Sequence, residues 1–407
     1  MKNIKVLIAH PGTQHSHRLV SILYQNGYLF KFYTGIAISK ETRFHQFIDM
    51  LPFKIRTKLS GRIIEKVPAN FIRNFWCNEL LAYLLLKIGI NPSRVFYTRN
   101  KIFQHLISKK AIREADIIIG FDTASWHLSE MCKRSGKKFI LDYSSIEPNF
   151  KNQICVKINN QFPQWSDMLQ PKQNKLLDLE RLEQKNADKI VVASSFTKKS
   201  MSQNLSSYEK ICIIPYGVDT DFFKPSKKIG VIDKKKVDFV FVGKIDAKKG
   251  IPLLLEAWKD EFIYKNSTLT LIGEVDNRTK SLIENVSKDI KITGKLSRID
   301  LANSLNNFTV MVFPSYFEGF GLVILEGLAS GLPVITTRNT GGLDIIENMK
   351  DGIIITEGDI GGLIDAVSFY INNIDNYPLY SNYARKKSEV YSWNLYAEKW
   401  SEVISIL

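Results

Sequence analysis

The sequence has no long uncharged apolar run. Leu80 to Leu86, the longest candidate, ends at Lys87, well short of the ~18 to 20 apolar residues of a membrane-spanning helix. The first ten residues hold too short an apolar core for a signal peptide and lead directly into His10-Pro11-Gly12, so we expect a first strand there. These absences predict a cytoplasmic protein.

Cysteine is also scarce. The four cysteines of the 407 residues, at positions 77, 132, 155 and 212, include no C-x-x-C pair. This spacing argues against a structural zinc site and against a disulfide framework.

The loop after the first strand lacks a dinucleotide-binding fingerprint, because Gly12 is its single glycine where G-x-G-x-x-G needs three. Three histidines occur there, but no Cys, Asp or Glu precedes Glu41, so we expect no metal. A loop at the carboxyl end of a first parallel strand normally faces the ligand cleft, which places Gly12 and His15 near the substrate.

Acidic residues are few in the first half of the chain. Residues 1–210 contain 33 Lys and Arg against 16 Asp and Glu, a net charge of +17. Residues 211–407 contain 23 Lys and Arg against 25 Asp and Glu, a net charge of −2. Residues 51–110 carry 12 basic and 2 acidic side chains mixed with aromatics. Such a surface suits an anionic membrane leaflet or a nucleic-acid backbone; the alternative is an ordinary solvated face.

Short apolar runs alternate with amphipathic stretches along the whole chain, the pattern of parallel sheets covered by helices. We expect a first α/β domain at 1–210 and a second at 211–387, joined by the Pro- and Gly-punctuated residues 215–225. Asp219-Thr220-Asp221 should be a turn in that connection rather than a metal site. The helical tail 388–407 could join the first domain. The expected strands are 4–9, 117–121, 138–142, 189–193, 237–242, 268–272, 289–292, 308–313, 333–336 and 352–355.

A loop with two glycines, Gly319 and Gly321, separates a strand ending at Phe313 from a helix beginning near Leu322. Free N–H groups at that helix start form an anion site. Glu326 is the only charged residue between 319 and 335, where an unpaired carboxylate is costly. It could accept two hydrogen bonds from a ribose diol; the alternative is a buried ion pair.

Lysines cluster where the segment Gly243 to Gly250 opens another helix. Cations at a helix N-terminus oppose its dipole by ~0.3 to 1 kcal/mol each, so Lys248 and Lys249 are poor structural choices. A phosphate bound between Lys244 and Lys249 would make their positive charges favourable there. The alternative is that these lysines are simply solvated.

These residues resemble glycosyltransferase family 4, the retaining nucleotide-sugar enzymes of GT-B fold. The resemblance covers most of residues 187–345. It rests on the E-x₇-E pattern of Glu318 and Glu326, the G-x₅-K-G pattern of Gly243 to Gly250, Leu271 to Gly273, Thr293-Gly294, Pro215 to Asp219 and Ala187 to Ser194.

The resemblance implies an α/β GT-B fold, with two Rossmann-like parallel-sheet domains facing a central cleft. Glu326 would hold the ribose of the donor, Glu318 would contact the transferred sugar, and Lys244 and Lys249 would bind the diphosphate. The remaining donor contacts would come from Gly12, Gly243, Thr293, Gly294 and the backbone of Gly319, Phe320, Gly321 and Leu322.

Two departures from the family pattern matter. Lys244 stands where the family usually has arginine, which keeps the charge but loses bidentate geometry. The family's usual histidine after a later strand of the first domain is missing, so Glu147 or His127 could act on the acceptor side.

The expected activity is therefore transfer of a sugar from a nucleoside diphosphate sugar to a hydroxyl, without a cofactor or a metal. A sugar-nucleotide isomerase and a DNA glucosyltransferase are the alternatives on the same fold. Nucleic acid is the less expected partner.

The basic, apolar segment 51–69 predicts docking on anionic lipid at the cytoplasmic face of the membrane. The acceptor would then be a lipid-linked glycan used in cell-surface polysaccharide or glycolipid assembly.

Overall fold

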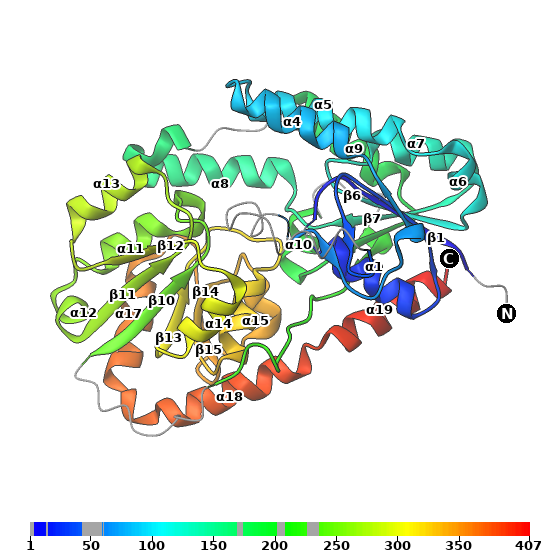
Figure 1. Ribbon diagram of the computed structural model, residues 1–407. Coiled ribbons are helices and arrows are strands. Elements are labelled where there is room, and N and C mark those ends of the chain that lie inside the picture. The colour runs from blue at the N-terminus through cyan, green and yellow to red at the C-terminus, as the bar shows by residue number, and fades with distance from the viewer. Residues whose placement is uncertain are drawn as a thin grey trace.

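The computed structural model describes residues 4–13, 15–42, 59, 61–168, 174–201, 208–225 and 236–407. Within these residues the chain forms two α/β domains that lie side by side (Figure 1). The predicted segment 51–69 falls partly outside this description, since residues 51–58 and 60 do not belong to it.

The first domain is built on a parallel sheet, which in the described residues has seven strands in the order β5-β2-β1-β6-β7-β8-β9. The central strands are buried along their whole length, as expected of strands covered on both faces. The strands are β1 (Val6–His10), β2 (Leu29–Thr34), β5 (Ile72–Asn74), β6 (Ile117–Phe121), β7 (Lys138–Tyr143), β8 (Lys189–Val192) and β9 (Ile211–Ile213). A separate small pairing joins β3 (Ile38–Ser39) to β4 (Ile63–Ile64).

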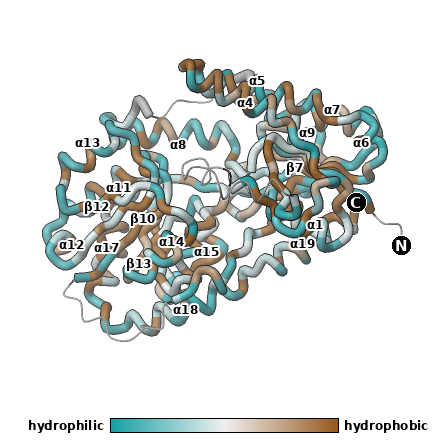
Figure 2. The backbone as a smooth tube through the Cα atoms, in the orientation of Figure 1, coloured by the Kyte–Doolittle hydropathy of each residue, from teal (hydrophilic) through white to brown (hydrophobic). Residues whose placement is uncertain are grey.

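The second domain repeats the plan with a parallel sheet, six-stranded in the described residues, in the order β12-β11-β10-β13-β14-β15. All six strands were expected from apolar runs: β10 and β15 have the predicted bounds, and the ends of the other four differ by one or two residues. They are β10 (Val237–Val242), β11 (Ser267–Ile272), β12 (Lys291–Gly294), β13 (Val310–Phe313), β14 (Val334–Thr337) and β15 (Gly352–Ile355). In Figure 2 these strands form the hydrophobic interior of the domain.

Helices cover the sheets and connect their parallel strands. Those of the first half of the chain are α1 (Ser16–Gln25), α4 (Trp76–Lys87), α5 (Pro92–His105), α6 (Lys109–Glu114), α7 (Trp126–Arg134), α8 (Pro148–Gln161), α9 (Asn174–Asn186) and α10 (Ser195–Ser200). Those of the second half are α11 (Ile251–Ala257), α12 (Glu261–Asn266), α13 (Asn277–Val286), α14 (Arg298–Leu305), α15 (Leu322–Ala329), α16 (Gly342–Ile345), α17 (Ile360–Asn372), α18 (Tyr377–Val390) and α19 (Trp393–Ser405). Of the helices described, none is long and apolar enough to cross a bilayer.

Two helices pack on the domain opposite to the one their sequence position suggests. Helix α19 returns to the first domain, where Asn26 donates to Ser401 at 3.1 Å, while α8 extends over the second domain (Figure 1). There Gln161 donates to the carbonyl of Gly358 at 2.8 Å and accepts from the Tyr316 hydroxyl at 2.7 Å. The boundary after residue 210 also shifts slightly, because β9 still pairs with β8 in the first sheet.

The connection between the domains follows β9. The Asp219 carboxylate accepts from the Phe222 N–H at 3.0 Å, which is the side-chain turn expected of this motif. Arg385 of α18 fixes the same segment, since its Nη1 donates to the carbonyls of Thr220 and Phe223 at 2.9 and 3.0 Å.

Candidate functional site

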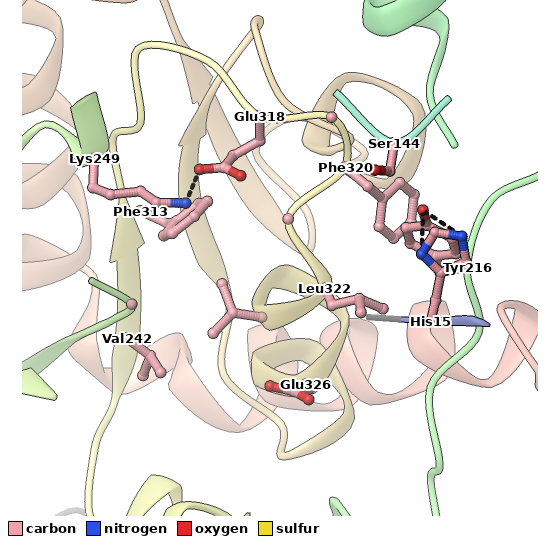
Figure 3. A pocket seen from close by; sticks show the side chains of 14 residues that line it. His15, Ser144, Tyr216, Val242, Lys249, Phe313, Glu318, Phe320, Leu322 and Glu326 are labelled. Atoms are coloured by element: carbon pink, nitrogen blue, oxygen red, sulfur yellow. Dashed lines mark hydrogen bonds and ion pairs between the residues drawn. The ribbon is translucent and has the colours of Figure 1, made fainter. Parts of the chain in front are cut away.

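A cavity of about 460 Å³ lies between the two domains (Figure 3). It opens at the carboxyl ends of parallel strands, since Val242 ends β10 and Phe313 ends β13, where open α/β sheets bind their ligands. Its volume is within the ~300 to 1,000 Å³ typical of small-molecule sites. The lining residues are His15, Ser144, Tyr216, Val242, Gly243, Lys249, Phe313, Glu318, Gly319, Phe320, Gly321, Leu322, Val323 and Glu326.

Lys249 and Glu318 form an ion pair on one side of this cavity (Figure 3). The Ser315 hydroxyl donates a further hydrogen bond to Glu318 at 3.1 Å. The loops after β10 and β13 are joined here, because the carbonyl of Lys248 accepts from the Tyr316 N–H at 2.8 Å. The structure thus brings together two residues for which the family resemblance implied separate roles, diphosphate binding and sugar contact.

Gly250 allows these two loops to come so close. Its φ of +78° lies in the left-handed region, and a Cβ placed on it would lie 2.1 Å from the carbonyl oxygen of Pro314. A side chain would therefore be both strained and blocked by backbone. The glycine that ends the G-x₅-K-G pattern is explained by this contact.

The first turn of α15 faces the cavity with Leu322 and Val323. Gly321 precedes it with a φ of +85° and has no side chain to cap the helix. The N–H groups of a first helical turn have no intrahelical partner, and they carry the positive end of the helix dipole. This helix start can bind an anionic group.

Glu326 lies one turn further along α15 and lines the same cavity (Figure 3). Burial raises the pKa of its carboxyl, and the positive charge of Arg298 opposes that rise. Among the described residues no side chain forms a hydrogen bond or an ion pair with this carboxylate, so the buried ion pair considered as the alternative is not formed there. Its oxygens can accept hydrogen bonds from a ligand.

Gly319 holds the glycine loop against the first domain. Its carbonyl accepts from the hydroxyls of Ser194 at 2.7 Å and Thr197 at 2.9 Å, at the start of α10. A Cβ at this position would lie 1.9 Å from the carbonyl oxygen of Ser144. The cavity therefore keeps its shape only if residue 319 has no side chain.

Gly319→Ala should lower turnover by about 10²-fold, because relieving the clash with Ser144 moves the donor loop relative to the first domain. The measurement is steady-state turnover together with the melting temperature. Gly61→Ala is the matched control, since a Cβ there meets nothing within 4 Å. Equal turnover in the two variants would contradict the prediction.

A buried network of polar side chains lies on the first-domain side of the cavity. His15 contacts Asp142 through Nε2 at 2.7 Å, and the Tyr216 hydroxyl lies 3.1 Å from His15 Nδ1. A histidine that donates from Nε2 to the carboxylate can accept at Nδ1 from the tyrosine. The ring of Tyr216 also contacts Phe320 with centroids 5.3 Å apart, so this network joins the first domain to the donor loop.

A second cavity of about 350 Å³ shares Ser144, Lys249, Glu318 and Gly319 with the first. Lys248 lines it, and burial followed by repulsion from Lys151 lowers the pKa of its ammonium group. An anion bound beside Lys248 would relieve that repulsion.

Several predicted site residues are not among those that line these cavities. Lys244 extends into solvent and pairs with Asp246 at 3.7 Å. Thr293 and Gly294 end the edge strand β12, where the Gly294 carbonyl accepts from Gly273 N–H at 3.0 Å. Gly12 packs against the ring of His10, whose Nε2 would lie 2.9 Å from a Cβ at that position.

The two acceptor-side candidates also have local roles. Glu147 is the N-cap of α8 and accepts from the Phe150 N–H at 2.9 Å. His127 stacks on His105 with ring centroids 4.2 Å apart. His15, expected near the substrate from its loop, lines the cavity.

The sequence analysis missed Ser144, Asp142 and Tyr216. Asp142 and Ser144 lie at the end of β7, so the rule that ligands meet the carboxyl ends of strands could have found them. Tyr216 was part of the matched segment Pro215 to Asp219, but nothing in the spacing showed that its ring turns toward the first domain.

Two Rossmann-like parallel-sheet domains around such a cavity have the GT-B architecture. A sucrose-phosphate synthase from Thermosynechococcus elongatus superposes with a TM-score of 0.68 over 98% of both chains at 18% identity. Anabaena HepE in complex with UDP and glucose superposes with a TM-score of 0.64 over 99% of this chain and 100% of its own, at 15% identity. Identities this low show the fold, and the predicted GT-B fold is confirmed.

Residues 222–387 match the family described as glycosyl transferases group 1. The capsular polysaccharide biosynthesis glycosyltransferase CapM of Staphylococcus aureus is 28% identical over 202 residues, 46% of this chain and 52% of CapM. The UDP-Gal:alpha-D-GlcNAc-diphosphoundecaprenol alpha-1,3-galactosyltransferase of Escherichia coli is 31% identical over 172 residues, 39% of this chain and 44% of its own. The chain spans about half the length of the curated relatives that it matches.

Proposed function

We propose that the protein transfers a sugar from a nucleoside diphosphate sugar to an acceptor hydroxyl with retention of configuration, as family 4 enzymes do. The observation that carries this proposal is the interdomain cavity. It combines the carboxylate of Glu326, which has no side-chain partner among the described residues, with the helix start at Leu322 and the ammonium group of Lys249. The match of residues 222–387 to glycosyl transferases group 1 supports the same reading.

The donor would lie along α15. Glu326 would accept hydrogen bonds from the ribose diol, and the diphosphate would lie at the N–H groups of the first turn. Figure 3 places Leu322 between Glu326 and the Lys249–Glu318 pair, so the sugar end of the donor would reach that pair. Glu318 would then contact the sugar hydroxyls.

Transfer breaks the bond between the anomeric carbon and the diphosphate oxygen and forms a bond from that carbon to the acceptor oxygen. The acceptor hydroxyl gives its proton to the departing diphosphate, and the nucleoside diphosphate leaves. Preorganised positive groups stabilise the charge that develops on the leaving oxygen. Lys249 and the α15 start would supply this stabilisation, so we expect no requirement for a bound metal or another cofactor.

We further propose that the acceptor is a lipid-linked glycan at the cytoplasmic face of the membrane, in the assembly of a cell-surface polysaccharide or glycolipid. The relatives named for capsular polysaccharide biosynthesis and for a diphosphoundecaprenol acceptor support this choice. The basic first half of the chain supports an anionic membrane as partner and leaves nucleic acid the weaker candidate.

A donor-hydrolysis screen tests the proposed activity. The protein is incubated with UDP-, GDP-, ADP- and dTDP-sugars, and the released nucleoside diphosphate and sugar are analysed. One donor class should release its diphosphate, with faster release when an acceptor is added and an unchanged anomeric configuration in the product. Conversion of the donor to another sugar without an acceptor would show an isomerase instead.

A further inference from the structure

Helix α4 exposes several large apolar side chains to solvent and buries the polar Asn78. Trp76, Leu84 and Ile88 are 60%, 50% and 73% exposed, whereas Asn78 is only 6% exposed. The buried Asn78 donates to the Arg99 carbonyl of α5 at 3.0 Å. We call the exposed set the α4 face: Trp76, Leu80, Leu81, Tyr83, Leu84 and Ile88.

The α4 face is a continuous apolar surface rather than a set of isolated exposed residues. Positions 76, 80, 84 and 88 are spaced by four and lie along one side of a helix. Figures 1 and 2 show α4 at the outer edge of the first domain, with hydrophobic colouring at its free end. Contiguous apolar surface of this kind marks an interaction site.

Basic residues flank the α4 face in the sequence. The described residues 61–110 contain nine Lys and Arg and two Glu, and one of the two, Glu79, is paired with Arg99 at 3.7 Å. Arg73, Lys87 and Arg94 are exposed close to the helix in sequence. The occupant of this surface should therefore be apolar in its interior and negatively charged at its boundary.

We infer that the α4 face is where the protein docks on an anionic lipid bilayer, with its apolar side chains among the acyl chains and the surrounding cations on the headgroups. An interfacial helix binds with an apolar face in the headgroup region and basic residues at its edge. This inference rests on the proposed function, because it names the surface that would bring the cleft to a lipid-linked acceptor.

An apolar recess continues the α4 face into the domain. A cavity of about 550 Å³ lies at the start of the helix and is lined by Trp76 together with Ala37, Ile38, Ala69 and Ile72. Ser39, Thr42 and Asn74 complete the lining, and Trp76 belongs both to the exposed face and to the recess.

A second copy of the chain fits this surface less well. Self-association through the α4 face would bring two sets of cations together, which costs free energy at ordinary ionic strength. The second half of the chain has a net charge of −2 and offers little compensation.

Vesicle co-sedimentation tests the inference. The wild-type protein should bind vesicles of phosphatidylglycerol and phosphatidylcholine, bind pure phosphatidylcholine weakly, and lose binding as salt rises because headgroup attraction is screened. Leu80→Ser with Leu84→Ser and Ile88→Ser should lower partitioning by about tenfold or more, since each leucine-sized side chain contributes to apolar burial. The matched control is Phe262→Ser with Leu379→Ser, two exposed apolar residues of the second domain, which should leave partitioning unchanged.

A conservative variant gives a readout that does not depend on the fold of the serine variant. Brominated phosphatidylglycerol should quench the tryptophan fluorescence of the wild type, and Trp76→Phe should remove most of that quenching while keeping vesicle binding. Equal quenching in both proteins would place the bilayer contact elsewhere and overturn the inference.

Nucleotide-sugar binding is measured on the same proteins without vesicles, so the two proposals fail separately. If the wild-type protein binds a donor but not anionic vesicles, the docking inference is wrong and the proposed function stands. If it binds vesicles but no donor, the proposed function is wrong. A third outcome would overturn the inference in another way. If the wild type is a dimer that binds no vesicles, and the triple serine variant is a monomer, the α4 face joins two copies of the chain.

Discussion

Glu326→Gln should weaken donor binding by about tenfold or more for each hydrogen bond lost, since a hydrogen bond to a charged group contributes ~1.5 to 3 kcal/mol. The fold should remain intact, because the substitution keeps side-chain volume and the carboxylate has no partner among the described residues. Titration calorimetry with the preferred nucleotide sugar measures the effect. Glu284→Gln, at an exposed acid paired with Lys280 at 3.6 Å, is the matched control.

The pH dependence of stability gives the same substitution a second readout. Burial raises the pKa of Glu326 above its ordinary value of 4.5 despite Arg298, so the folded state binds more protons than the unfolded state between the two pKa values. The free energy of unfolding contributed by this group therefore falls as pH rises through that window. Glu326→Gln should remove this fall and be at least as stable as wild type at neutral pH.

The two readouts together decide the role of Glu326. If Glu326 serves donor binding, its replacement should weaken the donor complex without destabilising the protein. An unchanged donor dissociation constant would contradict the ribose assignment, and a large loss of stability would show a structural role instead.

Lys249→Met should lower turnover by about 10² to 10³-fold, the usual effect of removing one preorganised group that stabilises developing negative charge. Donor binding should change less than turnover, since that charge develops on the leaving diphosphate in the transition state. Steady-state kinetics with the preferred donor measures both. Lys265→Met removes an exposed lysine paired with Glu261 and should leave turnover unchanged.

The ion pair with Glu318 requires a second control. Lys249→Met leaves Glu318 partly buried, with Ser315 as the remaining side-chain partner of its carboxylate among the described residues, so part of the effect could be structural. Combining Lys249→Met with Glu318→Gln removes both charges and should restore stability. If turnover returned with stability, Lys249 would be a structural cation and the proposed role would be wrong.

The sequence predicted the sheets better than the site, for a physical reason. Strands such as β6 and β10 are buried on both faces, and their unbroken apolar runs are visible without any tertiary contact. The missed strands β2, β5 and β9 lie toward the edges of the first sheet. Strand β2 includes Lys31, and β5 and β9 have only three residues each, which is too short for a periodic signal.

Within the site, local patterns predicted groups on one loop but not the partners across the cavity. The glycines around Leu322 and the isolated charge of Glu326 are local signals. The pairing of Lys249 with Glu318 joins residues 69 positions apart, and the contact between His15 and Asp142 joins residues 127 positions apart. Contacts between residues so far apart in the sequence depend on how the loops after parallel strands converge. That convergence is set by the order of the strands in the sheet.

The exchange of helices between domains limits how this chain can be divided. A fragment beginning at residue 211 lacks α8, whose Gln161 bonds to Tyr316 and Gly358. A fragment ending at residue 210 lacks α19, whose Trp393 ring lies 4.9 Å from the guanidinium of Arg18. Each fragment would expose surface that the other half normally covers, so a truncation study should keep α8 with the second domain and α19 with the first.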